Sequence, residues 1–289
     1  FVHAGPFGNI AHGCCSVVSD RMALSYADYV LTEAGFGADL GFEKFMHIKA
    51  RYNDLEPHAA VIVASARALK SHGGVPRREL ESPNPQAVSD GMPNLRHLIS
   101  AIKSFGLPVV VAINRFSSDT QEELSVMKSE SESAGANAAV ESDVFEHGGN
   151  GAIDLAKAVV EVSEGNAPSI KYMYEKEDNL EDKIKSLATK MYNASDVAYT
   201  PAARRILRQY ESNGWGHMPI CMAKTHLSLS HNRSLRGLPE NYTFRVSDVR
   251  VSRGAGFVYP IAGNIMTMPG LPGSPRQLDV DANGNILGL

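Results

Sequence analysis

Three basic side chains follow closely on an apolar run and form the strongest cationic cluster of the sequence. They are Arg67, Lys70 and His72, in the segment Val63-Ala-Ser-Ala-Arg-Ala-Leu-Lys-Ser-His-Gly-Gly74. If the apolar run Ala60–Ala64 is a buried strand, these cations lie near the edge of a sheet, where they would neutralise an anion. The alternative is the solvated start of a helix, which needs no ligand.

A histidine between glycines is a second candidate for chemistry. His12 lies in Gly8-Asn-Ile-Ala-His-Gly13, beside a run that should begin a helix. Such a histidine is commonly a loop residue that backbone groups satisfy. Its alternative role is that of an acid, a base or a phosphate ligand.

A glycine-rich turn, Gly35-Phe-Gly-Ala-Asp-Leu-Gly41, follows a predicted strand at residues 29–33. Its spacing is a variant of the dinucleotide-binding fingerprint, in which glycines admit a pyrophosphate at a helix N-terminus. That motif also needs an acidic residue at the end of the next strand, where this sequence has Ala-Ser-Ala-Arg67. We therefore favour a turn that places Glu33 and Asp39 at the carboxyl end of a strand over a site for NAD.

Other motifs fail on particular residues. The chain has no Gly-x-x-x-x-Gly-Lys-Ser/Thr, and the fragment Met222-Ala-Lys-Thr225 lacks the glycines of a P-loop. In Asn114-Arg-Phe-Ser117 a serine replaces the aspartate with which GTPases read guanine. Residues 279–286 copy the start of an EF-hand loop, but the bidentate glutamate would fall beyond the last residue. We predict a turn between two short strands there, and no metal site.

The charge balance and the apolar runs exclude two classes of partner. Lys plus Arg number 28 against 32 Asp plus Glu, which gives a formal charge of −4 without charged blocks. This balance does not favour a nucleic-acid surface, and no apolar run approaches the roughly 20 residues that cross a membrane. The three cysteines, Cys14, Cys15 and Cys221, are too few for a disulfide framework. We predict reduced thiols in a soluble, cytoplasmic protein.

Strand and helix patterns alternate over residues 1–165, which predicts an α/β fold with a mostly parallel sheet. The apolar runs lack period-two alternation, as strands buried on both faces do; they lie at residues 29–33, 60–64 and 108–114. A capping box of Thr120 and Glu123 opens a predicted helix at residues 119–135. Further helices are predicted at residues 180–191 and 200–213.

The last part of the chain has a different pattern. Residues 242–251 alternate by twos, and a glycine-containing turn separates them from residues 257–262, so we expect antiparallel strands there. The polar residues 76–91, which hold several prolines, are the most plausible place for a domain boundary.

Five segments resemble motifs of the formate–tetrahydrofolate ligase family, whose members are also called 10-formyltetrahydrofolate synthetases. They occur in the family's order and span the whole chain: Gly5-Pro-Phe-Gly-Asn-Ile-Ala-His-Gly13, Thr32-Glu-Ala-Gly-Phe-Gly-Ala-Asp-Leu-Gly41, the segment from Val63 to Gly74 quoted above, Cys221-Met-Ala-Lys-Thr225 and Met266-Thr-Met-Pro-Gly-Leu-Pro272. The resemblance implies that ATP, with Mg²⁺, phosphorylates formate. The amine of tetrahydrofolate would then attack formyl phosphate, and 10-formyltetrahydrofolate, ADP and phosphate would leave. A monovalent cation is left open as a further cofactor.

The resemblance also assigns expected roles to particular residues. His12 corresponds to a histidine near the family's catalytic site, and Arg67, Lys70 and Glu33 match motif positions, so all four are predicted catalytic residues. Phe116 matches an aromatic residue of the folate pocket. Phe145 falls where some members carry a tryptophan against the other face of the pterin, and the smaller ring puts the folate affinity in doubt.

The P-loop of this family lies upstream of the segment that begins here at Phe1, so the sequence resembles the C-terminal half of the enzyme. The implied fold is α/β: residues 1–95 as the C-terminal part of a P-loop-type nucleotide-binding domain with a mostly parallel sheet, and residues 96–289 as a smaller, folate-side α/β domain with some antiparallel strands. The expected partners are formate, ATP, tetrahydrofolate and the missing N-terminal half, and the complete protein would be a homo-oligomer. A halved sheet should leave unpaired edges and exposed apolar faces.

Three functions compete at this point. The first is a ligase segment that is inactive without its other half. The second is a truncated paralogue that holds folate without catalysis. The third is an NAD-dependent oxidoreductase, which rests on the turn at Gly35 alone.

Overall fold

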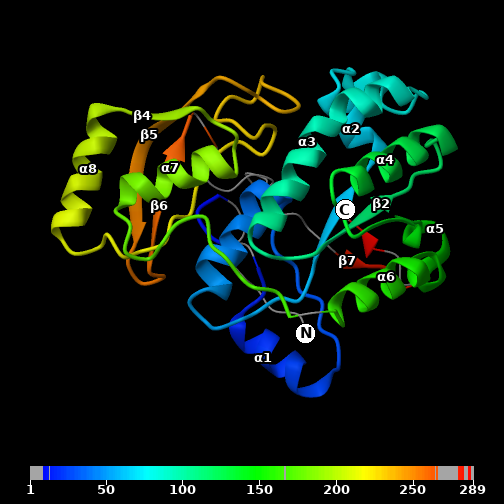
Figure 1. Cartoon of the computed structure of the whole chain (residues 1–289), viewed down its shortest axis with the longest axis horizontal. Coiled ribbons are helices and arrows are strands. Elements are labelled where there is room, and N and C mark those ends of the chain that lie inside the picture. The colour runs from blue at the N-terminus through cyan, green and yellow to red at the C-terminus, as the bar shows by residue number, and fades with distance from the viewer. Residues whose placement is uncertain are drawn as a thin grey trace.

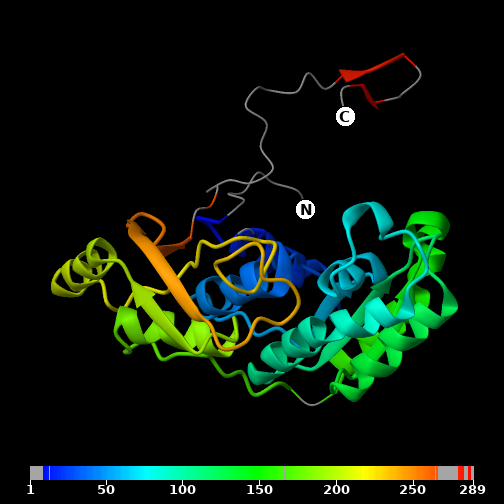
Figure 2. The same cartoon turned by 90° about the horizontal axis from the view of Figure 1, so that it is seen from above.

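The computed structural model describes residues 9–12, 14–165, 167–263, 265, 279–282 and 286–287. Most of its helices surround two three-stranded sheets. Figures 1 and 2 show the two sheets at opposite ends of the molecule, with the helices of residues 37–50 between them.

The first sheet is parallel and has the order β1-β2-β3. Its strands are β1 (Ala60–Ala64), β2 (Val109–Asn114) and β3 (Ala138–Ser142). The connections between successive strands carry α2 (Ala66–His72), η3 (Arg77–Glu79), α3 (Pro85–Ser104) and α4 (Gln121–Ser133). Because both crossovers advance in the same direction and parallel crossovers are right-handed, these helices cover one face. After β3 come α5 (Val144–His147), η4 (Gly148–Ala152) and α6 (Ile153–Ser163), and α6 packs against β2 and β3 on the other face.

The core of the first sheet lies under α3 and α4. Val109, Val111 and Ile113 of β2 are buried there with Leu95 and Leu124. The intervening residues of β2 are also buried, so this central strand is covered on both faces, as its unbroken apolar run predicts.

The second sheet has the order β4-β5-β6. Its strands are β4 (Asp196–Tyr199), β5 (Thr243–Ser252) and β6 (Phe257–Ala262), with β4 and β5 parallel and β5 and β6 antiparallel. It is accompanied by α7 (Leu180–Lys190) and α8 (Pro201–Ser212). Two bridges to β6 at Ile220 and Ala223 bring the segment before Lys224 beside this sheet. The short strands β7 (Asp279–Val280) and β8 (Ile286–Leu287) form an antiparallel pair, as expected for that stretch.

Two wide helical turns lie between the sheets. They are η1 (Gly37–Phe42) and η2 (Phe45–Ala50), π-helical segments that follow α1 (Val17–Tyr26). They bury an unusual set of charged side chains, including Glu43, Lys44 and Lys49. Because π-helical segments are often found at functional sites, η1 and η2 are candidate positions for one.

The α/β class, the parallel first sheet and the antiparallel β5–β6 pair are confirmed. The three predicted helices form, and the first of them opens with the predicted reciprocal capping box of Thr120 and Glu123. The strand predicted at residues 29–33 is wrong: no strand forms there, and Tyr29 and Leu31 lie on the surface. The predicted division at residue 95 lies inside α3, between two paired strands of one sheet, and it stays a prediction about the larger protein.

Helices α2 and α3 approach so closely that their contact requires glycine. A Cβ on Gly91 would lie 2.0 Å from the carbonyl oxygen of Leu69, and one on Gly73 would lie 2.2 Å from that of Ala87. Both obstacles are backbone atoms, which cannot move aside as a side chain would.

Gly91→Ala is therefore expected to lower the free energy of unfolding by about 2–3 kcal/mol, because the added methyl overpacks a helix contact. Urea denaturation measures the change. Gly254→Ala is the matched control, since nothing lies within 4 Å of a Cβ at that position. Equal effects of the two substitutions would show that loss of glycine flexibility, and not the α2–α3 contact, decides the result.

Candidate functional site

The carboxyl edge of the first sheet brings together an arginine and an aromatic ring. Arg67 lies near the start of α2, after β1, and Phe116 lies in the loop after β2. The guanidinium carbon of Arg67 is 4.3 Å from the centre of the Phe116 ring, a cation–π contact. Sequence analysis placed both residues in the site but did not foresee that they stack.

Polar groups surround this stacked pair. A terminal nitrogen of Arg67 is 3.1 Å from Oε1 of Glu81 and 3.5 Å from Oγ of Ser118. The backbone N–H of Phe116 donates to Asp119 Oδ2 at 2.9 Å, which fixes the turn that carries the ring. Because Glu81 is exposed, an incoming anion can replace it at Arg67 without burying an unpaired charge.

Phe145 lies on α5, after the neighbouring strand β3, and its side chain is 95 % exposed. On this short helix His147 Nδ1 is 2.9 Å from Asp143 Oδ2. An aromatic ring that is almost fully exposed at the ligand-binding edge of a parallel sheet offers a free face for stacking. The structure gives no contact between Phe145 and Phe116 among the described residues, although the loops that carry them follow adjacent strands.

Lys70 lies one turn after Arg67 on α2, but its side chain is fully buried, whereas that of Arg67 is partly exposed. Its ammonium is 2.9 Å from Oε1 of Glu123 on α4, and neither side chain is exposed. It also donates to the carbonyl oxygen of Ser82 at 3.1 Å. This geometry leaves Lys70 without access to a ligand, and the pair ties α2 to α4 behind Arg67.

His12 and Glu33 lie in a different part of the molecule, near the π-helical segments η1 and η2. The imidazole of His12 is partly buried, and its Nδ1 accepts from the N–H of Cys14 at 3.4 Å. Burial, and then the positive charges of Lys49 and Lys44, lower the pKa of His12, so the ring is neutral at neutral pH. Glu33 is exposed. No contact joins these two residues to Arg67 or Phe116 within the described ranges.

The three cysteines include Cys14, whose thiol donates to the carbonyl oxygen of His12 at 3.0 Å. All three are free, and Cys14 and Cys221 are buried. Burial raises the pKa of Cys14 to about 12 and that of Cys221 to about 11, so both remain thiols. Their free, buried thiols agree with the prediction that the cysteines are reduced.

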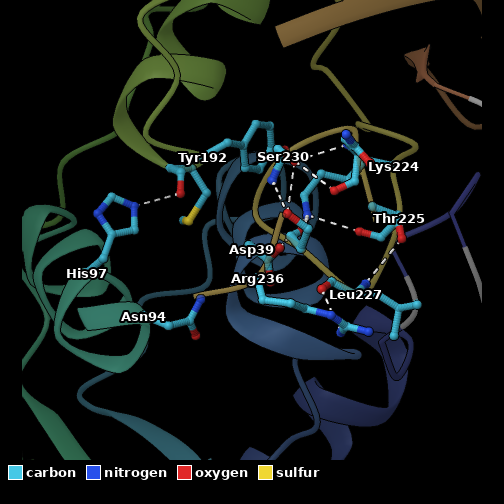
Figure 3. Close-up of polar contacts among 12 residues, drawn as sticks. Asp39, Asn94, His97, Tyr192, Lys224, Thr225, Leu227, Ser230 and Arg236 are labelled. Carbon is cyan, nitrogen blue, oxygen red and sulfur yellow. Dashed lines mark hydrogen bonds and ion pairs between the residues drawn. The ribbon is translucent and has the colours of Figure 1, made fainter. Parts of the chain in front are cut away.

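Sequence reasoning missed a polar network around Lys224 (Figure 3). The ammonium of this fully buried lysine lies 2.5 Å from Oδ2 of Asp39 on η1, and it donates to the carbonyl oxygen of Ser228 at 2.6 Å. Figure 3 also shows Arg236, which donates to the carbonyl oxygen of Leu227 at 3.1 Å. The ion pair of Lys224 and Asp39 joins the segment Cys221–Thr225 to the segment Thr32–Gly41. Both segments are among the five that resemble family motifs. The available signal was a lone lysine directly after the apolar run 220–223.

A second contact connects this network to α2. His72, the last residue of α2, accepts at Nδ1 from the N–H of Gly237 at 3.2 Å. Asn94 of α3 donates to the carbonyl oxygen of Gly237 at 2.8 Å. The segment Val63–Gly74 therefore also reaches the loop that begins at Thr225. The segment Met266–Pro272 lies outside the described residues, as do Gly5–Gly8 and Gly13 of the first segment.

Among the described residues, no three His, Cys, Asp or Glu side chains gather as a metal-binding group would. Over the same residues, no helix combines the length and apolar character needed to cross a membrane.

A parallel sheet that carries Arg67 over Phe116 at its carboxyl edge, with a free aromatic ring on the next loop, is typical of α/β proteins that bind ligands at this edge. A profile of the family described as formate–tetrahydrofolate ligase matches residues 1–289. The chain belongs to this family.

Three relatives with that same description are similar over the whole chain. The protein of Roseiflexus castenholzii (strain DSM 13941 / HLO8) is 49% identical over 300 residues, which make up 100% of this chain and 53% of the relative. Those of Desulforamulus reducens (strain ATCC BAA-1160 / DSM 100696 / MI-1) and Roseiflexus sp. (strain RS-1) are 48% and 49% identical over 298 residues, again 100% of this chain, and 52% and 53% of the relatives. The chain spans about half the length of these curated relatives.

Proposed function

We propose that this chain carries the folate site and part of the formyl-phosphate site of an ATP-dependent formate–tetrahydrofolate ligase, and that it turns over only with the other half of the enzyme. The observation that supports this most directly is the cation–π pair of Arg67 and Phe116, with the exposed Phe145 following the adjacent strand. Aromatic faces suit a flat pterin, and a guanidinium suits an acyl phosphate.

In the proposed reaction, formate takes the γ-phosphoryl group of ATP and gives formyl phosphate and ADP. The folate amine then attacks the formyl carbon, phosphate leaves with the bonding electrons of the C–O bond, and the amine loses a proton. Arg67 would stabilise the negative charge on the phosphate group as it leaves. His12, neutral through its lowered pKa, is suited to accept a proton. Glu33 stays a proposed site residue without a separate step.

Lys70 takes a different place in this proposal from the one its motif position suggests. Because its ammonium is buried against Glu123, it would hold α2 in position and would not touch the substrate. It is therefore a positioning residue for Arg67.

We assign the binding of ATP and Mg²⁺ to the part of the ligase outside this chain. The sequence contains no P-loop, and the described residues hold no cluster of metal-ligating side chains. A monovalent cation, homo-oligomeric assembly and a cytoplasmic location remain expectations for the complete enzyme. The runner-up function is a truncated paralogue that binds folate without catalysis.

Phe116→Ala is expected to weaken binding of tetrahydrofolate about tenfold, because one stacking face is lost. Calorimetric titration of the chain measures the affinity. Tyr26→Ala, which removes an exposed ring on α1, is the matched control and should bind as the wild type does. Unchanged affinity of Phe116→Ala would contradict the proposed site.

A mixing experiment separates the ligase from the truncated paralogue. The chain alone, with formate, ATP and tetrahydrofolate, is expected to release no ADP. Addition of the remaining part of the Roseiflexus castenholzii relative should restore turnover. Folate binding without recovery of turnover would favour the paralogue, and binding of NADH would favour the oxidoreductase.

A further inference from the structure

The segment that carries His12 is held at one backbone carbonyl, which lies shortly before the imidazole in the chain. The carbonyl oxygen of Asn9 accepts a hydrogen bond from the ammonium of Lys44 at 3.3 Å and a weaker one from the thiol of Cys221 at 3.7 Å. All three residues are buried. The two donors are 35 and 212 positions away from Asn9 in the sequence. The contact therefore ties this segment to two distant parts of the molecule.

The other hydrogen bonds around His12 are local. Residues 9–12 belong to no helix or strand, so no ladder of backbone hydrogen bonds fixes them. Nδ1 of His12 accepts from the N–H of Cys14 at 3.4 Å, and the Cys14 thiol donates to the carbonyl oxygen of His12 at 3.0 Å. These bonds orient the ring relative to its own segment, whereas the contacts at Asn9 join the segment to distant elements.

The chemistry of Lys44 indicates more than packing. This residue lies between η1 and η2 and is 2% exposed. A buried ammonium loses water, which costs free energy, and this one gains a hydrogen bond to a neutral carbonyl. Acidic residues of the same helical stretch face other groups: Asp39 pairs with Lys224, and the carboxylate of Glu43 lies 3.3 Å from His47 Nδ1. Because an apolar side chain would fill the position without this cost, the lysine contributes its donor and its charge.

The charge of Lys44 also acts on the imidazole. Burial is the main cause of the lowered pKa of His12, and the positive charges of Lys49 and Lys44 lower it further. The ammonium of Lys49 lies 2.5 Å from Oδ2 of Asp20. Four further titratable groups act on Cys14 in the same segment: Lys49, Asp20, Cys15 and Glu33. One cation thus holds the backbone of the segment and favours the uncharged ring.

We infer that Lys44 is a positioning residue for His12: through the carbonyl oxygen of Asn9, and together with Cys221, it fixes the segment on which the imidazole lies. Lys44 touches no substrate in this assignment. Its meaning for the ligase reaction rests on the proposed function, in which His12 takes part. The contacts themselves need no ligand, so they can be tested in the chain alone.

Lys44→Met removes the charge and the donor but keeps an unbranched side chain. In the chain without substrates, the NMR titration midpoint of the His12 ring should rise by at least about 0.5 pH unit, because a nearby cation is lost and water gains access to the ring. The amide of Cys14, which donates to the imidazole, should exchange with solvent at least about threefold faster. Lys128→Met, at an exposed position of α4, is the matched control and should change neither value.

A second pair of variants leaves the ammonium in place and decides the question if Lys44→Met does not fold. Cys221→Ala removes the thiol donor and should speed exchange at Cys14, whereas Cys221→Ser keeps a donor and should behave like the wild type. Equal exchange in these two variants, or unchanged titration and exchange in Lys44→Met, would overturn the proposal. So would a raised midpoint without faster exchange, because Lys44 would then act by its charge alone.

Kinetics separate this proposal from the proposed role of His12. With the remaining part of the Roseiflexus castenholzii relative added, Lys44→Met should lower kcat at least about tenfold and leave KM for tetrahydrofolate unchanged. If the His12 titration and the Cys14 exchange change as expected but kcat does not, Lys44 positions the imidazole and the role proposed for His12 in the reaction is wrong.

Discussion

Replacement of Glu123 by alanine is expected to lower the free energy of unfolding by about 3–5 kcal/mol, because it leaves the buried ammonium of Lys70 without its carboxylate. The two charged groups are 2.9 Å apart, and neither side chain is exposed. The same carboxylate accepts from the N–H of Asn84 at 2.8 Å and from the N–H of Thr120 at 2.9 Å. One side chain thus joins the beginnings of α3 and α4 to α2, and its loss affects all three.

The pH dependence of stability gives an independent measurement. Burial alone would raise the pKa of Glu123, but hydrogen bonds from the backbone of Thr120 and Asn84 and from Lys70 outweigh it, so the pKa is lowered from 4.5. The unfolded chain then binds the proton more tightly than the folded one. The stabilisation from Glu123 is complete above pH 4.5 and is lost as the pH falls through the folded pKa. Urea denaturation between neutral and acidic pH should show a weaker loss for Glu123→Gln than for the wild type.

The control for this pair is the double variant Lys70→Met, Glu123→Leu. Removing both charges avoids an orphaned ion, so the double variant should lose less stability than the two single variants together. Lys157→Met on α6 breaks an ion pair whose side chains are 74% and 83% exposed, and it should change stability little. A cost of Glu123→Ala no larger than that of Lys157→Met would show that the buried pair does not hold the helices.

Short sequence patterns predicted correctly those features of the fold that depend on residues close together in the chain. The capping box of Thr120 and Glu123 needs only residues within one turn, and it forms as predicted. The second role of Glu123, as the partner of Lys70, depends on a contact across more than fifty positions of the chain, which no local pattern contains. Residues 29–33 have the composition of a strand, but a strand also needs a neighbour, and none of the described strands lies beside them.

The candidate site was predictable in location and not in detail. An α/β pattern places residues such as Arg67 and Phe116 at the carboxyl edge of the sheet, and the structure brings these two into contact. The sequence could not show that Lys70 faces inward, since Arg67 and Lys70 look equally available in a basic cluster. The sequence places Lys224 in a failed P-loop fragment and in a segment that resembles a family motif, but it does not show the partner of this lysine, because Asp39 is far away in the chain. The roles proposed for His12, Glu33 and Phe145 stay predictions.

Replacement of Lys224 by methionine is expected to lower the free energy of unfolding by about 3–5 kcal/mol, because Asp39 keeps its charge in a largely buried position. The carboxylate of Asp39 is 15% exposed and lies 2.5 Å from the ammonium. The carbonyl oxygens of Ser228 and Thr225 lose the same donor. Since Asp39 belongs to η1 and Lys224 to the loop beside the second sheet, this pair joins the middle of the molecule to one end.

The two buried lysine–carboxylate pairs differ in their electrostatics. For Glu123 the pKa shift favours the charged form, whereas burial lowers the pKa of Lys224 despite the opposing effect of Asp39. The unfolded chain therefore holds the Lys224 proton more tightly than the folded chain does. For this group, the free energy of unfolding is expected to rise as the pH rises through the folded pKa towards 10.5. Removing one partner of the Lys224–Asp39 pair destabilises the protein, because it leaves a buried charge unpaired. Burial of the intact pair also costs free energy, because both charged groups lose water.

Three measurements test this account of Lys224. The double variant Lys224→Met, Asp39→Leu removes both charges and should recover most of the stability that Lys224→Met loses. Lys185→Met, which breaks an exposed pair with Asp196, is the matched control and should unfold like the wild type. In Lys224→Met the amides of Leu227 and Ser230, which donate to side chains of the loop, should exchange faster, because the loop has lost its anchor. If Lys224→Met unfolds like Lys185→Met, or if the double variant is less stable than the single one, the ion pair is not what holds the loop against η1.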